Sequence, residues 1–399
     1  MPEFLPGDTT PAFSRPVLLV DTLSATNDYA VELALALAAV VRLTVFTIET
    51  TSLRDGPAMK ILPYFPRYGG GATRLAKSMA ALRGTVALTR ALWRHRRGVV
   101  HVQFMRFPRV EWFVYLLLRP WLACLVITVH NALPHERRPW HRAFYGSWYR
   151  RADRIHVLSA NVGRQLTETM GISATRMDII PHGDYRRFMA RNQPAVELSM
   201  FGVPALFDPA RVVVGFFGLI RPYKGLASLA RAFAMVTSRR ATLLVAGKIE
   251  SSATAEMVEV AASLAGDDRY HLLPRFLDDH ELAALLTRAD ILVFPYTDIS
   301  QSGALMLALT YGKAVIANDI GGFREYLHEG ETGLLCDTGD ARVFAATLTR
   351  LIDDKELRER LSQNAQREMH SRFGWGTIAS SLVNCYRHAL AAREPADRV

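Results

Sequence analysis

Short apolar runs alternate with longer segments of helical spacing along the chain. The apolar runs are rich in Val, Ile, Leu and Phe, as are strands that are buried on both faces of a sheet. Between these runs, segments such as residues 226–237 and 281–288 carry apolar residues three and four positions apart, which predicts amphipathic helices. The alternation predicts an α/β protein with parallel sheets and crossover helices.

The predicted strands form two series, separated by a polar stretch with prolines at residues 190–210. The first series comprises residues 16–21, 42–48, 98–104, 124–130, 154–159 and 177–182. The second comprises residues 212–218, 242–247, 270–276, 291–296, 314–319 and 332–337. Each series predicts one doubly wound parallel sheet, and we expect the carboxyl ends of both sheets to face a common cleft.

These series define the expected domains. Residues 1–195 are predicted to form a first Rossmann-like domain, and residues 205–372 a second one. A helical stretch follows in residues 373–399, and we expect it to cross back to the first domain.

Composition and charge narrow the class of protein. Half of the residues are hydrophobic and 22% are charged, which is typical of a folded globular chain. Lys and Arg number 48 against 38 Asp and Glu, a net charge of +10 that favours anionic partners: nucleotide phosphates, nucleic acid or anionic lipid. Cys124, Cys336 and Cys385 are too far apart for a disulfide framework or a metal site. The N-terminus lacks the pattern of a secretory signal, so we expect a cytoplasmic protein.

Residues 113–129 come nearest to a membrane span. Arg119 and Pro120 interrupt this stretch, whereas a span needs about 20 mainly apolar residues. The sequence favours a buried helix, a turn and then a core strand, with a transmembrane segment as the alternative.

Residues 212–225 run from a buried strand into a loop that begins at Gly218 and carries Arg221 and Lys224. Loop amides, a helix N-terminus and two cations suit a diphosphate. Gly247, at the end of the next strand, is assigned to the same donor site. The alternative interpretation is an ordinary solvated loop.

A second polar cluster follows the strand that ends at Tyr296. Gln301, Ser302 and Gly303 come just before an apolar helical run, so their exposed amides are candidates to bind a phosphate or a sugar hydroxyl. Capping of the helix by Ser302 explains the same pattern without a ligand.

Candidate acid–base groups lie in the first domain. His130 ends a predicted strand, and His135 and Glu136 follow in the adjoining loop, where each could act as a base or bind sugar hydroxyls. Asp28 follows the first strand, where it either caps a helix or serves as a base. A structural histidine and a paired Glu136 are the alternatives.

Several motifs together resemble a known family, the GT-B glycosyltransferases of bacterial exopolysaccharide assembly. The likeness is greatest to the xanthan-type mannosyltransferases that act on a lipid-linked oligosaccharide, and it covers most of the chain. It rests on GLIRPYKG at residues 218–225, PY at 295–296, QSGALMLALTYGKAVIA at 301–317, HNALPHERRPW at 130–140 and PHGDYRRF at 181–188.

One region departs from that pattern. Residues 321–335 are similar to a broad retaining family in which two glutamates, with seven residues between them, contact the donor. The corresponding positions here hold Ile299 and Leu307, so the pair is absent. This difference favours the relatives that carry QSG and an inverting mechanism.

The resemblance implies that residues 1–195 bind the acceptor and residues 205–372 bind the donor. It also implies roles for the candidate residues. Arg221 and Lys224 would clamp the donor diphosphate, with support from the Ser302 and Gly303 amides. His130 would lie near the donor sugar, and His182 with Gly183 would form the interdomain turn. The base would be Glu136 first, with Asp28 and His135 as alternatives.

The resemblance also implies the partners of the reaction. We expect GDP-mannose as donor, with UDP-glucose or UDP-glucuronate as alternatives, and a lipid-linked saccharide as acceptor. No cofactor and no metal are expected, because cations can stabilise the leaving diphosphate in place of a metal. A non-catalytic nucleotide-sugar-binding partner is the rival from another class.

Tryptophans and arginines are interleaved in the first domain. This pattern suits an anionic membrane surface, so we expect a peripheral protein on the inner face of the plasma membrane. Buried tryptophans and a nucleic-acid surface are the alternatives, and we expect no nucleic acid because no reading motif accompanies the patch. The tryptophans are Trp93, Trp112, Trp121, Trp140 and Trp148.

Overall fold

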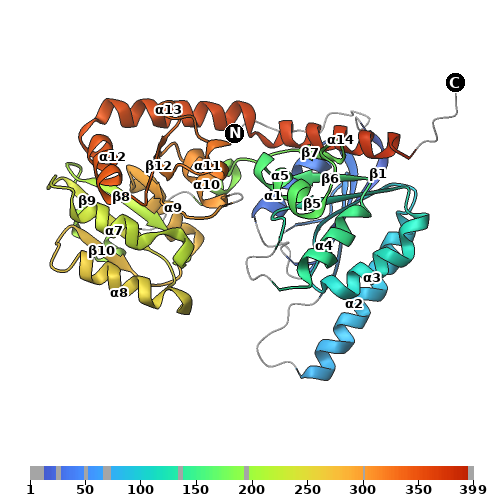
Figure 1. Cartoon of the computed structure of the whole chain (residues 1–399). Coiled ribbons are helices and arrows are strands. Elements are labelled where there is room, and N and C mark those ends of the chain that lie inside the picture. Colours follow the sequence, from blue (N-terminus) through green and yellow to red (C-terminus); the bar gives the residue numbers. More distant parts are fainter. Residues whose placement is uncertain are drawn as a thin grey trace. The chain divides into compact units, whose positions relative to one another are not determined.

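The computed structural model describes residues 13–23, 28–48, 53–65, 73–133, 138–192, 197–299 and 302–393. The chain divides into two compact units, drawn in Figure 1. Unit 1 consists of residues 1–183 and 374–399, and unit 2 of residues 184–373. Among the described residues, no helix is long and apolar enough to cross a membrane.

Unit 1 contains a seven-stranded parallel sheet with the strand order β3-β2-β1-β4-β5-β6-β7. The strands are β1 (Phe13–Asp21), β2 (Val41–Ile48), β3 (Met59–Phe65), β4 (Val99–Phe104), β5 (Cys124–Val129), β6 (Arg154–Val157) and β7 (Met177–Ile179). The doubly wound sheet predicted for this half is confirmed. Its edge strand β3 was not predicted, because Lys60 and Pro63 interrupt the apolar run.

Helices cover both faces of this sheet. One buried cluster packs α1 and α14 against one face of the sheet. Another packs α2, α3, α4 and α5 against the other face. The helices are α1 (Asp28–Ala38), α2 (Arg74–Arg94), α3 (Pro108–Leu118), α4 (His141–Arg150), α5 (Ala160–Met170) and α14 (Trp375–Ala391). After α3, a short helix, η1 (Arg119–Trp121), leads the chain into β5. Helix α3 is not the buried helix predicted here, since Phe113 and Leu117 on its outer face are more than half exposed.

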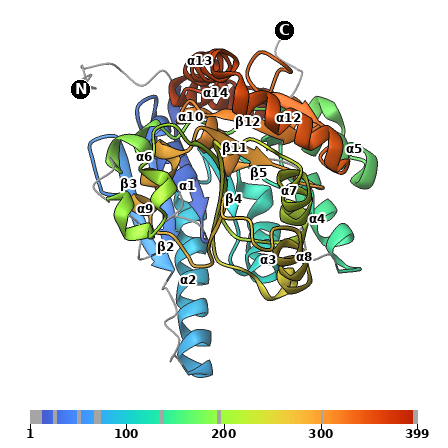
Figure 2. The same ribbon diagram turned by 90° about the vertical axis from the view of Figure 1, so that its left-hand side faces the viewer.

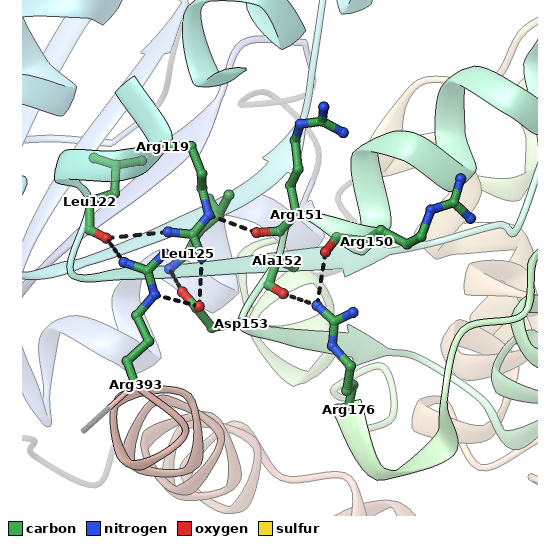
Figure 3. A network of polar contacts seen from close by, with 9 residues as sticks. All are labelled: Arg119, Leu122, Leu125, Arg150, Arg151, Ala152, Asp153, Arg176 and Arg393. Carbon is green, nitrogen blue, oxygen red and sulfur yellow. Dashed lines mark hydrogen bonds and ion pairs between the residues drawn. The ribbon is translucent and has the colours of Figure 1, made fainter. Parts of the chain in front are cut away.

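A polar network ties the end of α14 to unit 1 (Figure 3). The Asp153 carboxylate accepts hydrogen bonds from the Leu125 amide at 2.7 Å, from Arg119 at 2.6 Å and from Arg393 at 2.9 Å. Arg393 also donates to the Leu122 carbonyl. One carboxylate therefore joins η1, β5 and the chain after α14, so the last helix is part of unit 1.

Unit 2 repeats the arrangement with six parallel strands in the order β10-β9-β8-β11-β12-β13. The strands are β8 (Val212–Phe217), β9 (Ala241–Ala246), β10 (Tyr270–Leu273), β11 (Ile291–Phe294), β12 (Ala314–Asn318) and β13 (Leu334–Cys336). The second predicted sheet is thus confirmed as well.

The helices of unit 2 again form two layers. One buried cluster contains α7, α8 and α12, and another contains α9, α10 and α13. The helices are α6 (Arg186–Arg191), α7 (Leu226–Ala234), α8 (Thr254–Ser263), α9 (Asp279–Arg288), α10 (Gly303–Thr310), α11 (Gly321–Arg324), α12 (Ala341–Asp353) and α13 (Lys355–Arg372).

The strand order reverses at one point in each sheet. In unit 1 the switch lies between β1 and β4, and in unit 2 it lies between β8 and β11. Open α/β sheets bind ligands outside the carboxyl ends of their strands at such points. A ligand-binding site is therefore expected at the loops that follow β1, β4, β8 and β11.

Candidate functional site

The loops after β8 and β9 each begin with a glycine, and these two glycines are in close contact. Gly218 has φ 105°, and its amide donates to the Ala246 carbonyl at 3.0 Å. A Cβ atom on Gly247 would lie 1.8 Å from the Gly218 carbonyl oxygen. The two chain segments can approach this closely only because neither residue carries a side chain.

The loop after β8 then packs against the end of β11. A short helix, η5 (Pro222–Lys224), ends at Gly225, which has φ 71° and precedes α7. A Cβ on Gly225 would lie 2.1 Å from the Pro295 carbonyl oxygen. This contact holds the loop across the switch point of unit 2.

Lys224 lies at this switch point with its ammonium buried. Its side chain is 8% exposed, and Nζ lies 5.4 Å from the centre of the Tyr296 ring. Among the described residues it has no hydrogen bond and no ion pair. Burial, and then the Arg221 charge, lower the pKa of Lys224 to about 8. This loop therefore holds a buried cation that no hydrogen bond or ion pair of the described residues neutralises.

Arg221 is the second cation of the loop, and it is already paired. Its Nη2 donates to the Glu250 carboxylate at 2.8 Å, and both side chains are about one-third exposed. The hydrogen bond with Glu250 raises the pKa of Arg221. The Arg221 Nε is buried and has no partner among the described residues. Glu250 was not among the predicted site residues, because it lies 29 positions further along the chain.

Around Tyr296, the carboxyl ends of β11 and β12 are held together. The Asn318 side chain donates to the Tyr296 carbonyl at 2.8 Å and accepts from the Thr338 amide at 3.2 Å. The Thr297 amide donates to the Tyr223 carbonyl at 2.8 Å. Asn318 was missed by sequence reasoning, although a polar residue at the end of an apolar strand was the signal for it.

Ser302 caps α10, as the alternative interpretation proposed. Its hydroxyl accepts from the Leu305 amide at 3.1 Å. Gly303 lies beneath the Tyr185 hydroxyl, which would be 2.8 Å from a Cβ at that position. The capping bond accounts for Ser302 without a ligand, whereas Gln301 lies outside the described residues.

The switch point of unit 1 is closed by a carboxyl group that the sequence analysis did not single out. Glu111, in the first turns of α3, is fully buried and accepts from the Thr22 hydroxyl at 3.0 Å and the Phe107 amide at 2.8 Å. Burial raises the pKa of Glu111 to about 7, against the opposing effect of these hydrogen bonds. Glu111 thereby joins the loop after β1 to the loop after β4, and it was a visible signal as the single acid in residues 74–133.

His130 follows β5 at the same edge of the sheet. Its ring stacks on Phe104 with centroids 4.0 Å apart, and it meets Tyr29 edge-on at 5.3 Å. Burial, and then the neighbouring histidines, lower the pKa of His130 well below 6.5. The ring is therefore neutral at physiological pH.

Hydrogen bonds determine which nitrogen of His130 carries the proton. His156 Nε2 lies 2.8 Å from the Ile180 carbonyl, which can only accept, so His156 Nδ1 accepts the Thr128 hydroxyl proton. Thr128 must then accept from the Gln103 amide nitrogen at 2.8 Å. The Gln103 oxygen consequently faces His130 Nε2 at 3.3 Å and accepts from it. His130 is left with an unprotonated Nδ1, which can accept a hydrogen bond.

His182 and Gly183 are the last residues of the first segment of unit 1. His182 is buried between Tyr29 and Trp375, with ring centroids 4.6 Å and 6.2 Å away. Its Nδ1 donates to the Gly183 carbonyl at 2.7 Å. A Cβ on Gly183 would lie 2.4 Å from the Trp375 ring, so this turn packs directly on the start of α14.

Other predicted residues lie outside what the structure describes. Glu136 and His135 fall in the gap at residues 134–137, and the side chain of Asp28 is not described. At the positions of the absent glutamate pair, Ile299 and Leu307 pack in the core of unit 2. Within the described ranges, no group of three His, Cys, Asp or Glu side chains could hold a metal ion.

Two family models match the chain. The model for group 1 glycosyl transferases matches residues 204–368, most of unit 2, and the model for glycosyltransferase family 4 matches residues 26–183 of unit 1.

Similar proteins agree with this match. The D-inositol 3-phosphate glycosyltransferase of Corynebacterium efficiens is 30% identical, over 82% of this chain and 80% of its own length. The GDP-mannose:glycolipid 4-beta-D-mannosyltransferase of Xanthomonas campestris pv. campestris is 29% identical, over 52% of this chain and 56% of its own length.

A solved structure extends the likeness to the whole fold. The Anabaena protein HepE in complex with UDP-glucose is 18% identical, with a TM-score of 0.67, over 93% of this chain and 98% of that one. Two doubly wound sheets with equivalent strand orders, and a family match in each unit, lead to one conclusion. The chain belongs to the group 1 glycosyltransferases and is an enzyme with the GT-B fold.

Proposed function

We propose that this glycosyltransferase moves a hexosyl unit from a nucleotide sugar to a lipid-linked saccharide in exopolysaccharide assembly. Unit 2 binds the donor, and unit 1 binds the acceptor. The observation that carries the proposal is Lys224, a buried cation that forms no hydrogen bond and no ion pair among the described residues.

A diphosphate fits this environment better than a neutral ligand does. Lys224 and Arg221 together bring two positive charges against the one negative charge of Glu250. An incoming phosphate supplies the missing anion, and it forms charge-assisted hydrogen bonds that are stronger than neutral ones. As the bond to the sugar breaks, the same cations stabilise the charge that develops on the leaving diphosphate. The reaction then needs no metal ion, and the donor is a co-substrate.

GDP-mannose is the donor that we favour. The name of the Xanthomonas relative specifies GDP-mannose and a glycolipid acceptor, and its match supports the proposal. UDP-glucose or UDP-glucuronate is the alternative, because the Anabaena structure holds UDP-glucose in the same fold. A diphosphate clamp at Lys224 is compatible with either nucleobase, the guanine of GDP-mannose or the uracil of a UDP-sugar.

The acceptor hydroxyl needs a base if the configuration inverts. We propose Glu136 for this role, with Asp28 and His135 as alternatives. His130 presents a neutral Nδ1 lone pair and a ring supported by Phe104, which suits a hydrogen bond from a sugar hydroxyl.

A transfer assay tests the proposal. The purified enzyme is incubated with sugar-labelled GDP-mannose, UDP-glucose or UDP-glucuronate and with membranes that contain lipid-linked saccharides, and label in the lipid extract is measured. Label from GDP-mannose, in the presence of a chelator, supports the proposal. Transfer from a UDP-sugar alone overturns the choice of donor, and loss of transfer with the chelator overturns the metal-independent reaction.

A control separates specific transfer from background. The Glu136→Gln variant is assayed alongside a Glu359→Gln variant, whose residue has an exposed side chain on α13 and pairs with Lys355. Loss of transfer in the first variant alone supports Glu136 as the base. Equal activity in both variants overturns that assignment.

A further inference from the structure

Helix α2 carries a row of exposed apolar side chains. They are spaced by three, four and seven residues, so at roughly 100° per residue they share one face of the helix. The row consists of Leu75, Met79, Leu82, Val86 and Trp93, which are between 40% and 70% exposed. No described residue covers this face.

Helix α3 and the turn after it carry a second row, formed by Val110, Phe113, Leu117 and Trp121, each about half exposed. Helices α2 and α3 pack against each other, and the rings of Trp93 and Trp121 meet with centroids 6.1 Å apart. The two rows therefore form one surface, which we call the α2–α3 face.

The charge around this face has a single sign. Residues 74–121 include ten Lys or Arg residues and one acid, the buried Glu111. Arg83, Arg90 and Arg94 project from α2 roughly 60–100° around the helix from its apolar row. In the described part of the chain, these three arginines form no hydrogen bond or ion pair.

Other arginines in the region have a different role. Arg119 donates to Asp153 and to the Arg151 carbonyl, as Figure 3 shows. The Arg151 side chain donates to the Ser147 carbonyl. Trp148 is buried in the core and does not contribute to the surface. The exposed, unpaired cations are thus concentrated beside the apolar rows of the α2–α3 face.

The direction of α2 relates this face to the sheet. Because α2 leads into β4, its first residues lie toward the carboxyl edge, where Glu111 and His130 also lie. Figures 1 and 2 both show the N-terminal half of α2 extending beyond the rest of unit 1. An object that contacts Leu75 and Leu82 would therefore lie next to the candidate acceptor edge.

We propose that the α2–α3 face docks on a bilayer containing anionic phospholipid. The apolar rows enter the interface, the arginines meet the phosphate headgroups, and Trp93 and Trp121 lie at the headgroup level. A second copy of the chain fits poorly, because the same cations would face each other with no carboxylate between them.

Docking at this face gives unit 1 a defined orientation on the membrane. The carboxyl edge of its sheet is held beside the bilayer, so a saccharide on a lipid anchor reaches the edge while its lipid stays in the membrane. This consequence rests on the proposed function, whereas docking itself does not.

Vesicle flotation of the full chain tests the proposal. Vesicles of equal parts phosphatidylglycerol and phosphatidylcholine are compared with vesicles of phosphatidylcholine alone. We expect binding to the anionic vesicles, and about 30-fold weaker binding for Arg83→Gln/Arg90→Gln. Equal binding of this variant and the wild-type protein would overturn the proposal.

Matched apolar variants locate the surface. Leu82→Ser/Val86→Ser removes residues that are 65% and 40% exposed, and Val258→Ser/Val343→Ser removes residues of unit 2 that are 68% and 43% exposed. We expect a loss of at least tenfold in vesicle binding for the first pair only. Equal losses for both pairs, or a monomer–dimer change in place of vesicle binding, would overturn the assignment.

Nucleotide-sugar binding by the same variants separates the two proposals. The α2–α3 variants are expected to bind the donor as the wild-type protein does, because their residues belong to unit 1. Vesicle binding that persists when no donor binds would refute the proposed function and leave the docking surface intact.

Discussion

The Lys224 ammonium lies 5.4 Å from the centre of the Tyr296 ring, and among the described residues it forms no hydrogen bond and no ion pair. A buried charge without a partner costs the folded state free energy. A donor diphosphate would relieve that cost, so binding and stability are linked at this one side chain.

Replacing Lys224 tests this link. Burial lowers the pKa of Lys224 from 10.5 to about 8, so the unfolded chain binds more protons between these pH values. Wild-type stability therefore rises with pH across this window. We expect Lys224→Met to abolish this rise and to stabilise the ligand-free protein at pH 7 by roughly 3 kcal/mol. Urea unfolding at pH 7 and pH 9.5 measures both effects.

The exposed Lys355 provides the control, because its ammonium lies in water beside Glu359. Lys355→Met should leave the pH dependence of unfolding unchanged. If Lys224→Met destabilises the ligand-free protein at pH 7, the ammonium has a structural partner and the account of this site is wrong.

Glu111 makes the switch point of unit 1 sensitive to pH. Its folded-state pKa of about 7 lies above the usual value of 4.5, so its contribution to stability is full below pH 4.5 and is lost as pH rises through 7. The neutral Glu111→Gln variant should therefore gain roughly 2 kcal/mol over the wild-type protein between pH 5 and pH 8. Urea unfolding at both pH values measures the difference, and a constant difference would show that Glu111 titrates normally.

The hydrogen-bond network fixes the tautomer of His130. We expect nitrogen NMR to show a neutral ring with the proton on Nε2 from pH 5.5 to pH 8.5, because the Gln103 oxygen accepts at that atom. In Gln103→Met this preference should weaken, while His156, bonded to the Ile180 carbonyl, keeps its own tautomer. A His130 ring that gains a proton near pH 6.5 would contradict the derived network.

Alanine substitutions at two glycines with nearly equal φ values distinguish the cost of a steric clash from the cost of an unfavourable backbone conformation. Gly225 and Gly266 have φ 71° and 72°, but only at Gly225 would a Cβ meet another atom, the Pro295 oxygen at 2.1 Å. Gly266→Ala should cost about 1 kcal/mol, and Gly225→Ala at least 2 kcal/mol more. Thermal unfolding of both variants measures this, and equal losses would mean that the loop does not press on β11.

Sequence periodicity predicted the two sheets because their strands are buried on both faces and read as continuous apolar runs. It missed β3, where Lys60 and Pro63 break the run at a sheet edge. The fold was thus predictable from local pattern wherever local pattern and burial agree.

The candidate site was less predictable, since it depends on which loops the strand order brings together. Lys224 and Arg221 could be identified because both lie in one loop after a strand. The contacts of Glu250 and Glu111 could not be predicted, because their partners lie 29 and 89 positions away in the sequence. The exposure of the tryptophans could not be predicted either. Trp148 and Trp121 both lie among arginines and aromatic residues in the sequence, but Trp148 is buried and Trp121 is exposed.

Calorimetric titration with nucleotide sugars tests the central claim most directly. GDP-mannose, UDP-glucose and UDP-glucuronate are titrated, with and without a chelator, into the wild-type protein and Arg221→Ala/Lys224→Ala. We predict that GDP-mannose binds the wild-type protein equally well with the chelator, and that the double variant binds it at least 100-fold more weakly, because two charged contacts are lost. A folded wild-type protein that binds none of the three donors, or a double variant that binds as the wild type does, would contradict the account.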